Sequence, residues 1–328
     1  MKLATLKDGS RDGQLVVVSR DLSHAHYATG IANRLQQVLE DWGFFAPQLQ
    51  DLSDALNAGR AHHAFPFDPQ QCMAPLPRAY QCLQGVAPMS EDGAARPSMP
   101  EMVQLAGDAL LGACADIAAA SSAMEIDFGA GLAVITGDIA TASTPAQALD
   151  GVRLVVLANT LSLRALEARE RAAGQGPLLS RPATAFSPVA VTLDELGAAW
   201  DGGRVALALQ VGLNGRKFGL CDGAAGMPFG FGELIAHAAR TRPVRAGSIV
   251  CSGPLATAAA PGTPGRAESA RGFSSIAAKR RAEVQDSGQS STGYLQPGDL
   301  LRMEMKGISG ASLFGTIEQG VADSLPVP

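Results

Sequence analysis

The most informative stretch of the sequence runs from residue 126 to 138 and reads Ile-Asp-Phe-Gly-Ala-Gly-Leu-Ala-Val-Ile-Thr-Gly-Asp. Its alternating residues predict a buried β-strand that ends in a Gly-Asp turn. Gly129 and Gly131 lie two apart, so they fall on one face at the start of that strand. Glycine inside a strand marks a bulge, a bend, or a place where a ligand or another backbone comes close. We therefore expect a face without side chains at this point.

The common chemical motifs are absent from the sequence. It contains no Gly-x-Gly-x-x-Gly, Walker A, Gly-x-Ser-x-Gly or His-Glu-x-x-His pattern. Five widely spaced cysteines without a Cys-x-x-Cys pair argue against structural zinc or a disulfide framework and favour a reducing cytoplasm. A net charge of −5 indicates no nucleic-acid surface. No run approaches the roughly 18 apolar residues of a membrane span. These features predict a soluble cytoplasmic protein without a cofactor.

Residues 1–72 predict a small α+β domain. Segments 3–6 and 15–19 flank two Asp-Gly pairs, which is typical of a β-hairpin. Apolar residues at spacings of three and four then predict two short helices separated by Gly43 and Pro47.

Residues 73–328 predict a larger, mostly β domain. Helices are expected near 101–120, where alanine is abundant, and near 232–241. The Gly/Pro-rich stretch 253–272 lacks periodicity and predicts a long loop that is either a lid or disordered. Apolar or alternating runs predict strands at 132–136, 152–158, 183–191, 205–213, 248–252, 299–305 and 312–317. The fold class is therefore mixed, β-rich α+β.

Six segments, in order along nearly the whole chain, resemble the fumarylacetoacetate hydrolase family. They are Ala-Pro-Leu-Pro-Arg-Ala-Tyr-Gln (74–81), the 126–138 stretch, Leu-Ala-Asn-x-x-Ser-Leu-Arg (157–164), Ser-Arg-Pro-Ala-Thr-Ala-Phe-Ser-Pro-Val-Ala-Val (180–191), Asn-Gly-Arg-Lys-Phe-Gly (214–219) and Pro-Gly-Asp-Leu-Leu-Arg-Met-Glu-Met (297–305). The resemblance implies a β-roll or β-sandwich behind a small amino-terminal α+β domain, and a homodimer. It also implies cation-assisted C–C cleavage, decarboxylation or tautomerisation of small oxo-acids.

The family's cation ligands are replaced in this sequence. Members of the family hold a divalent cation with a Glu-x-Glu pair, because residues i and i+2 of a strand place two carboxylates on one face. The resemblance puts Gly129 and Gly131 at those positions and Thr160 at that of a third ligand, an aspartate. The family's catalytic-histidine segment corresponds to a shorter stretch at 88–93. The resemblance therefore implies a retained fold and a lost metal site.

Two aspartates, Asp127 and Asp138, frame the gap without replacing the missing pair. A slip of two residues would instead make Glu125 and Asp127 the pair. The matching residues on both sides of the gap oppose that register.

The resemblance also supplies candidate functional residues. Arg181 stands where the family has a lysine, and Gly253-Pro254 follows Ser252 where Gly-Thr is expected. The catalytic residues are not identified, but Thr160, Arg181 and Tyr80 are candidates for hydrogen bonding to an enolate or oxyanion. The candidate substrate-binding residues are Gly129, Gly131, Thr160, Arg181, Ser252 and Gly253.

Three hypotheses for the function follow from these replacements. The preferred one is a metal-independent enzyme that cyclises, dehydrates or tautomerises a small or polyketide-like oxo or β-dicarbonyl substrate, held in a roomier, more apolar cleft. The rival is a catalytically inactive binding or regulatory pseudoenzyme that keeps the dimer surface. The third is an ordinary C–C bond hydrolase with a rearranged site.

Overall fold

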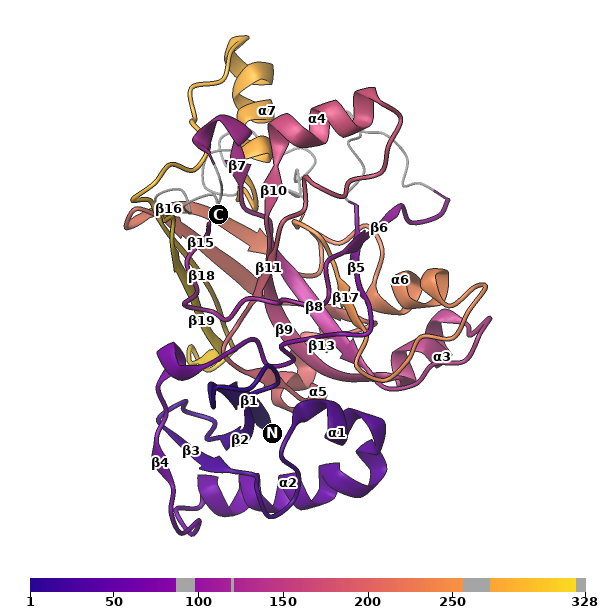
Figure 1. The fold of residues 1–328 in the computed structure, drawn as a ribbon, viewed down its shortest axis with the longest axis vertical. Coiled ribbons are helices and arrows are strands. Elements are labelled where there is room, and N and C mark those ends of the chain that lie inside the picture. Colours follow the sequence, from indigo (N-terminus) through magenta and orange to yellow (C-terminus); the bar gives the residue numbers. More distant parts are fainter. Residues whose placement is uncertain (87–97, 119–120, 256–271, 323–328) are drawn as a thin grey trace.

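A large mixed sheet runs through both the amino-terminal part and the rest of the chain. The computed structural model describes residues 1–86, 98–118, 121–255 and 272–322 (Figure 1). Within these residues, eleven strands form the sheet: β1 (Lys2–Leu6), β2 (Gln14–Val18), β3 (His24–Tyr27), β4 (Phe65–Pro66), β5 (Cys82–Gly85), β6 (Met102–Leu105), β8 (Ala130–Thr136), β9 (Val152–Thr160), β11 (Thr184–Phe186), β12 (Ala190–Val191) and β17 (Ile249–Cys251). Their order is β4-β3-β2-β1-β12-β9-β8-β17-β5-β6, with β11 also paired to β9. Because β1 pairs with β12, the first strands extend the sheet of the larger part.

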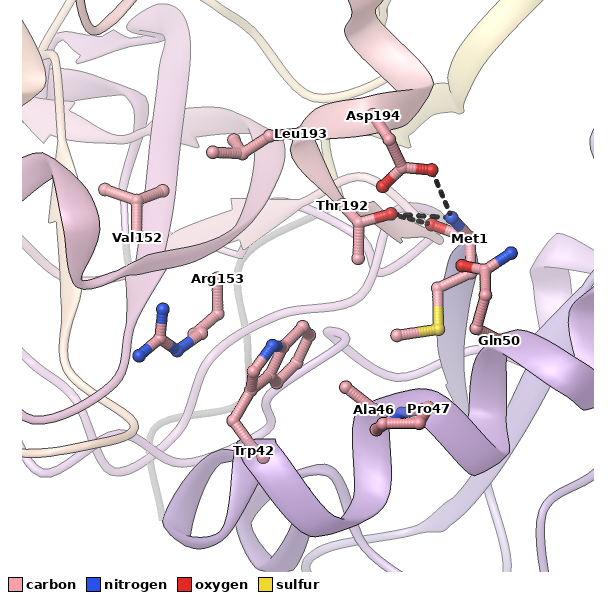
Figure 2. Close-up of a pocket in the computed structure, with 11 residues that line it drawn as sticks. Met1, Trp42, Ala46, Pro47, Gln50, Val152, Arg153, Thr192, Leu193 and Asp194 are labelled. Carbon is pink, nitrogen blue, oxygen red and sulfur yellow. Dashed lines mark hydrogen bonds and ion pairs between the residues drawn. The ribbon is translucent and has the colours of Figure 1, made fainter.

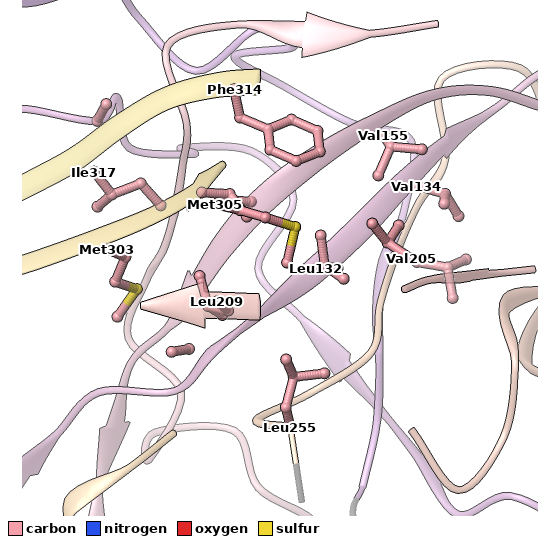
Figure 3. Close-up of a cluster of buried hydrophobic side chains, with 14 of the residues drawn as sticks. Leu132, Val134, Val155, Val205, Leu209, Leu255, Met303, Met305, Phe314 and Ile317 are labelled. Carbon is pink, nitrogen blue, oxygen red and sulfur yellow. The ribbon is translucent and has the colours of Figure 1, made fainter. Parts of the chain in front are cut away.

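A second sheet packs against one face of the first. Its strands, in the order β16-β15-β18-β19, are β15 (Ala208–Leu213), β16 (Arg216–Asp222), β18 (Leu300–Lys306) and β19 (Ser312–Gly320). Figure 3 shows Leu132 and Val155 of the large sheet meeting Leu209, Met305 and Phe314 of the small one. Each of these buried side chains contributes about 1.5–3 kcal/mol of transfer free energy. The result is the β-sandwich core that the sequence predicted.

Short strand pairs and helices complete the fold. The pairs are β7 (Ile126–Asp127) with β10 (Ser162–Leu163) and β13 (Trp200–Asp201) with β14 (Arg204–Val205). The helices are α1 (Leu35–Glu40), α2 (Trp42–Asn57), α3 (Pro145–Asp150), α4 (Arg164–Ala172), α5 (Leu193–Leu196), α6 (Phe231–Ala238) and α7 (Ile276–Ser287). Figure 1 shows α1 and α2 at one end of the molecule and α4 and α7 at the other. In the described residues, no helix combines the length and apolarity required to cross a bilayer.

The predicted break at Gly43 and Pro47 is wrong. Helix α1 ends at Glu40, and α2 continues through Pro47 as one helix of 16 residues. Proline removes one helical hydrogen bond. Burial of Leu49 and Leu56 against the sheet outweighs that loss, because each side chain gains about 1.5–3 kcal/mol on burial.

The predicted Ala-rich helix near 101–120 is also wrong. The described part of this segment contains β6, followed by irregular chain with a turn and isolated bridges, and Leu110 donates its backbone N–H to the carbonyl of Pro77 at 3.1 Å. A Cβ on Gly112 would lie 2.7 Å from the carbonyl oxygen of Cys72. Contacts with the 72–79 segment therefore override the helix propensity of alanine.

The remaining predictions for the elements are largely confirmed. β1 and β2 form the expected hairpin, with Leu3 opposite Val17, and α6 lies where a helix was expected. Each predicted strand region contains a strand, but 183–191 forms two short strands, β11 and β12, on either side of Ser187-Pro188. Most of the 253–272 loop lies outside the described residues. The domain boundary after residue 72 stays a prediction.

Candidate functional site

Gly129 and Gly131 lie where β7 passes into β8, opposite the end of β9. The backbone of Gly129 is held from both sides: its N–H donates to Asn159 Oδ1 at 3.1 Å, and its carbonyl accepts from the N–H of Thr160 at 2.9 Å. Gly131 pairs with Ala158 in the same ladder. Positions 129, 131 and 160, which the resemblance aligned with the family's cation ligands, are therefore neighbours in space.

Other segments of the chain fill the space in front of the two glycines. A Cβ on Gly131 would lie 2.3 Å from the carbonyl oxygen of Gly253 and 2.8 Å from Ser252 Oγ. A Cβ on Gly129 would lie 2.5 Å from Thr160 Oγ1. Real Cβ atoms do not approach other atoms so closely, so neither position can hold a carboxylate in this arrangement. The expectation of a roomier cleft is wrong at these positions, because a second backbone segment lies there.

Ser252 fixes the segment that closes the gap. Its backbone N–H donates to the carbonyl of Leu132 at 2.8 Å, and its hydroxyl accepts from the N–H of Leu132 at 3.1 Å. The same hydroxyl donates to the carbonyl of Gly253 at 2.7 Å. Gly253 has a φ of +75°, a conformation that glycine adopts without strain. Ser252 and Gly253 thus act as structural residues that hold the Gly253 carbonyl against Gly131.

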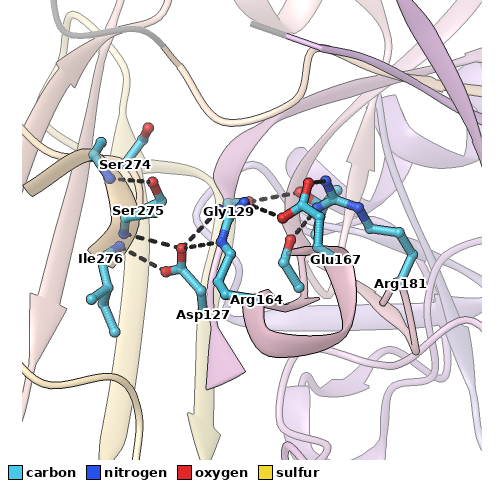
Figure 4. A network of polar contacts seen from close by, with 12 residues as sticks. Asp127, Gly129, Arg164, Glu167, Arg181, Ser274, Ser275 and Ile276 are labelled. Atoms are coloured by element: carbon cyan, nitrogen blue, oxygen red, sulfur yellow. Dashed lines mark hydrogen bonds and ion pairs between the residues drawn. The ribbon is translucent and has the colours of Figure 1, made fainter. Parts of the chain in front are cut away.

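Asp127 is completely buried and fully paired. Its carboxylate lies 2.7 Å from Arg164 Nη2 and accepts from the backbone N–H groups of Ile276 at 2.7 Å and Ala277 at 3.1 Å (Figure 4). These N–H groups open helix α7, where a negative charge is stabilised by the helix dipole. Burial raises the pKa of Asp127, and the Arg164 guanidinium and the two N–H groups oppose that rise. Asp127 thus joins β7, α4 and α7, and both of its carboxylate oxygens are engaged within the chain.

Arg181 belongs to the same polar network. Its guanidinium pairs with Glu167 at 2.8 Å and donates to Ser162 Oγ, and Glu167 also pairs with Arg164 at 2.7 Å. Burial raises the pKa of Glu167, but the two arginines outweigh burial and hold it below its usual value. The carboxylate that Arg181 binds is thus the chain's own Glu167.

The other candidates are scattered. Thr160 is 2% exposed, and its hydroxyl lies 3.4 Å from the carbonyl of Gly129, so it belongs to the packed wall. Tyr80 is 68% exposed, and its hydroxyl lies 3.3 Å from Glu40 of α1. Asp138 is 66% exposed and accepts from the backbone N–H of Ala246. The structure thus brings together the 129, 131, 160 and 252–253 positions, but not Tyr80 or Asp138.

The residues around Gly129, Gly131 and Thr160 do not fit a divalent cation. Hard cations take six or more oxygen ligands, usually including carboxylates. In the part of the chain that the structure describes, no group of three or more His, Cys, Asp or Glu side chains is placed to hold a metal. The 88–93 stretch, which corresponds to the family's histidine segment, lies outside the described residues.

Neither Glu167 nor the amino-terminal turn of α7 was predicted from the sequence to be part of this site. Glu167 follows Arg164 by three residues on α4, a spacing at which opposite charges meet. That signal could have been detected. The partner of Asp127 at Ile276 is 149 residues away, and no local pattern indicates it.

Two family models together match almost the whole chain. Residues 1–78 match "Fumarylacetoacetase N-terminal domain 2" and residues 79–322 match "Fumarylacetoacetate (FAA) hydrolase C-terminal". The chain therefore belongs to the fumarylacetoacetate hydrolase family. No curated protein matches the sequence.

Solved structures share the fold at low sequence identity. A putative HpcE protein from Mycobacterium smegmatis has a TM-score of 0.67 and 18% identity, with 98% of this chain and 100% of that chain covered. A maleylpyruvate hydrolase from Sphingobium sp. SYK-6, in complex with manganese(II) and pyruvate, has a TM-score of 0.66 and 14% identity over 99% and 100%. A 5-carboxymethyl-2-hydroxymuconate delta-isomerase from Mycobacterium smegmatis has a TM-score of 0.61 and 15% identity over 99% and 100%. At this identity the likeness establishes the fold alone.

Proposed function

We propose that this chain is a fumarylacetoacetate hydrolase family protein that works without the family's cation and acts by binding a small molecule, as the pseudoenzyme hypothesis holds. One observation carries the loss of the cation: the Cβ of any residue other than glycine at 131 would lie 2.3 Å from the Gly253 carbonyl oxygen. A pair of glutamates cannot converge on a cation there unless residues 252–254 move.

The metal-independent enzyme is less well supported, because its candidate groups are engaged or remote. Arg181 is paired with Glu167, Thr160 lies in the packed wall, and Tyr80 is on the surface next to Glu40. Stabilising an oxyanion requires donors aimed at a site that a substrate can occupy. In the described residues, none of these three groups meets that requirement.

The chemistry of the relatives provides the test. The purified protein is incubated with maleylpyruvate, with and without Mn²⁺, beside a maleylpyruvate hydrolase as the positive control, and its metal content is measured after dialysis. We expect neither turnover nor stoichiometric metal. Turnover that requires Mn²⁺, or a full equivalent of retained metal, would contradict the proposal. Turnover of a β-dicarbonyl panel without metal would favour the enzyme instead.

A homodimer and a cytoplasmic location are further proposals. The homodimer is proposed from family membership, and light scattering at the monomer mass of 33.7 kDa would contradict it. The five free cysteines are compatible with the reducing cytoplasm, where disulfides are rare.

A further inference from the structure

A pocket of about 430 Å³ lies between helix α2 and the larger part of the chain (Figure 2). This volume is within the range of small-molecule sites, which occur preferentially at domain junctions. The pocket is separate from the site described above, because neither Gly129 nor Gly131 lines it.

The walls of the pocket are largely apolar. Trp42, Ala46 and Pro47 of α2 form one side, and Val152 and Leu193 belong to the other (Figure 2). An indole ring beside aliphatic side chains favours a ligand with a flat, apolar body.

Arg153 supplies a positive charge to the lining. Its Nη1 donates to the carbonyl of Asp150 at 2.8 Å. Its Nε has no hydrogen-bond partner but is buried beside Gly137, so the terminal nitrogens are the donors available to a ligand. Among the described residues, no carboxylate forms an ion pair with Arg153. The lining carboxylate Asp194 lies on another side of the pocket and contacts the amino group of Met1 at 3.3 Å (Figure 2).

An arginine with unused donors beside an apolar pocket is suited to a carboxylate. The guanidinium offers five N–H donors in a planar fork that matches two carboxylate oxygens. Here one Nη1 N–H is used by a backbone carbonyl and the Nε–H is buried, so the ligand's carboxylate would take the remaining N–H groups of Nη1 and Nη2. The opposite wall supplies the apolar surface that the body of such a ligand requires.

We propose that this pocket binds a small carboxylic acid with a flat, unsaturated or aromatic body, its carboxylate on Arg153 and its body against Trp42. The proposal specifies the ligand class for the binding role proposed above and rests on that role. The cation and turnover assays concern residues around Gly131, whereas the test below concerns Arg153. Failure of one is therefore distinguishable from failure of the other.

The first experiment compares two ligands that differ only at the carboxylate. trans-Cinnamate and its neutral amide, which replaces one carboxylate oxygen by an NH₂ group, are titrated into the full chain by isothermal titration calorimetry. We expect saturable cinnamate binding with a dissociation constant below about 1 mM. The amide should bind at least about tenfold more weakly, because it cannot form the charge-assisted pair. No saturable binding of cinnamate, or equal affinity for the amide, would overturn the proposal.

Variants then locate the site. Arg153→Gln should weaken cinnamate binding at least about tenfold and remove the preference over the amide. Arg216→Gln changes an exposed arginine on β16 and is the matched control, expected to bind as the parent does. Ala46→Leu, which narrows the pocket from α2, should weaken both ligands. If Arg153→Gln and Ala46→Leu both bind like the parent, cinnamate binds elsewhere and the proposal is wrong.

Discussion

The surroundings of Gly129 and Gly131, at the start of β8, differ from the pocket beside α2 in how much space is open and in whether the charged groups are paired. Thr160 and Pro254 fill the space in front of Gly129, and Ser252 and Gly253 fill that in front of Gly131. The nearby charged groups are paired. At the α2 pocket, about 430 Å³ is open and Arg153 has no ion-pair partner among the described residues. The position around Gly129 and Gly131 is thus packed like a core, whereas the pocket at α2 has the volume and apolar lining of a binding site.

A network of paired charges holds the elements next to the first region together. Asp127, Arg164, Glu167 and Arg181 form a connected series of ion pairs that also holds the start of α7. A buried charge is tolerated when it is paired and its remaining hydrogen-bonding capacity is satisfied. Such a network fixes the surrounding elements and leaves little capacity for a ligand.

The largest expected effect comes from removing the central carboxylate. Asp127→Ala would remove the ion pair with Arg164 and the acceptor for two N–H groups of α7. Breaking a buried pair costs about 3–5 kcal/mol, so urea unfolding should show a loss of that size. Asp138→Ala is the control, because that side chain is 66% exposed and should cost less than about 1 kcal/mol. Equal losses would mean that the network does not stabilise this region more than a surface contact does.

A smaller loss of stability is expected when a methyl group is added at Gly131, where Gly253 fills the space. Gly131→Ala places a carbon 2.3 Å from the Gly253 carbonyl oxygen, so residues 252–254 must shift. Overpacking of this kind costs about 1–3 kcal/mol, measurable by the same urea unfolding. Gly30→Ala is the control, because nothing lies within 4 Å of its Cβ position. If neither substitution changes the free energy of unfolding, residues 252–254 shift at little cost. The two regions would then not differ in how firmly their residues are held.

The parts of the fold that depend on local pattern could be predicted from the sequence. Alternating residues located β8 and β9, and Asp-Gly pairs located the β1–β2 hairpin. The closure of Gly131 by Gly253 could not be predicted, because it depends on the approach of two segments distant in sequence. Contacts between distant segments also explain the non-helical chain at 102–118, where local alanine propensity predicts a helix. Motif order led to the prediction that positions 129, 131 and 160 correspond to the cation ligands, which stays a prediction, but it did not indicate what occupies the space in front of them.

The last comparison sets Asp127, at the start of α7, against a carboxylate near the end of the same helix. Glu283 accepts from the backbone N–H groups of Ser291 at 2.8 Å and Thr292 at 2.9 Å, and from the Thr292 hydroxyl. Burial raises the pKa of Glu283, but these hydrogen bonds lower it further, to about 2, from 4.5 in a free side chain. Its stabilisation is therefore complete above about pH 4.5 and is lost as the pH falls toward 2. The measurement is the free energy of unfolding of the parent and of Glu283→Gln across this range. The difference between them should be largest near neutral pH and shrink toward pH 2. A difference that does not depend on pH would show that the charge of Glu283 contributes nothing, and that burial, as at Asp127, is needed before a paired carboxylate stabilises α7.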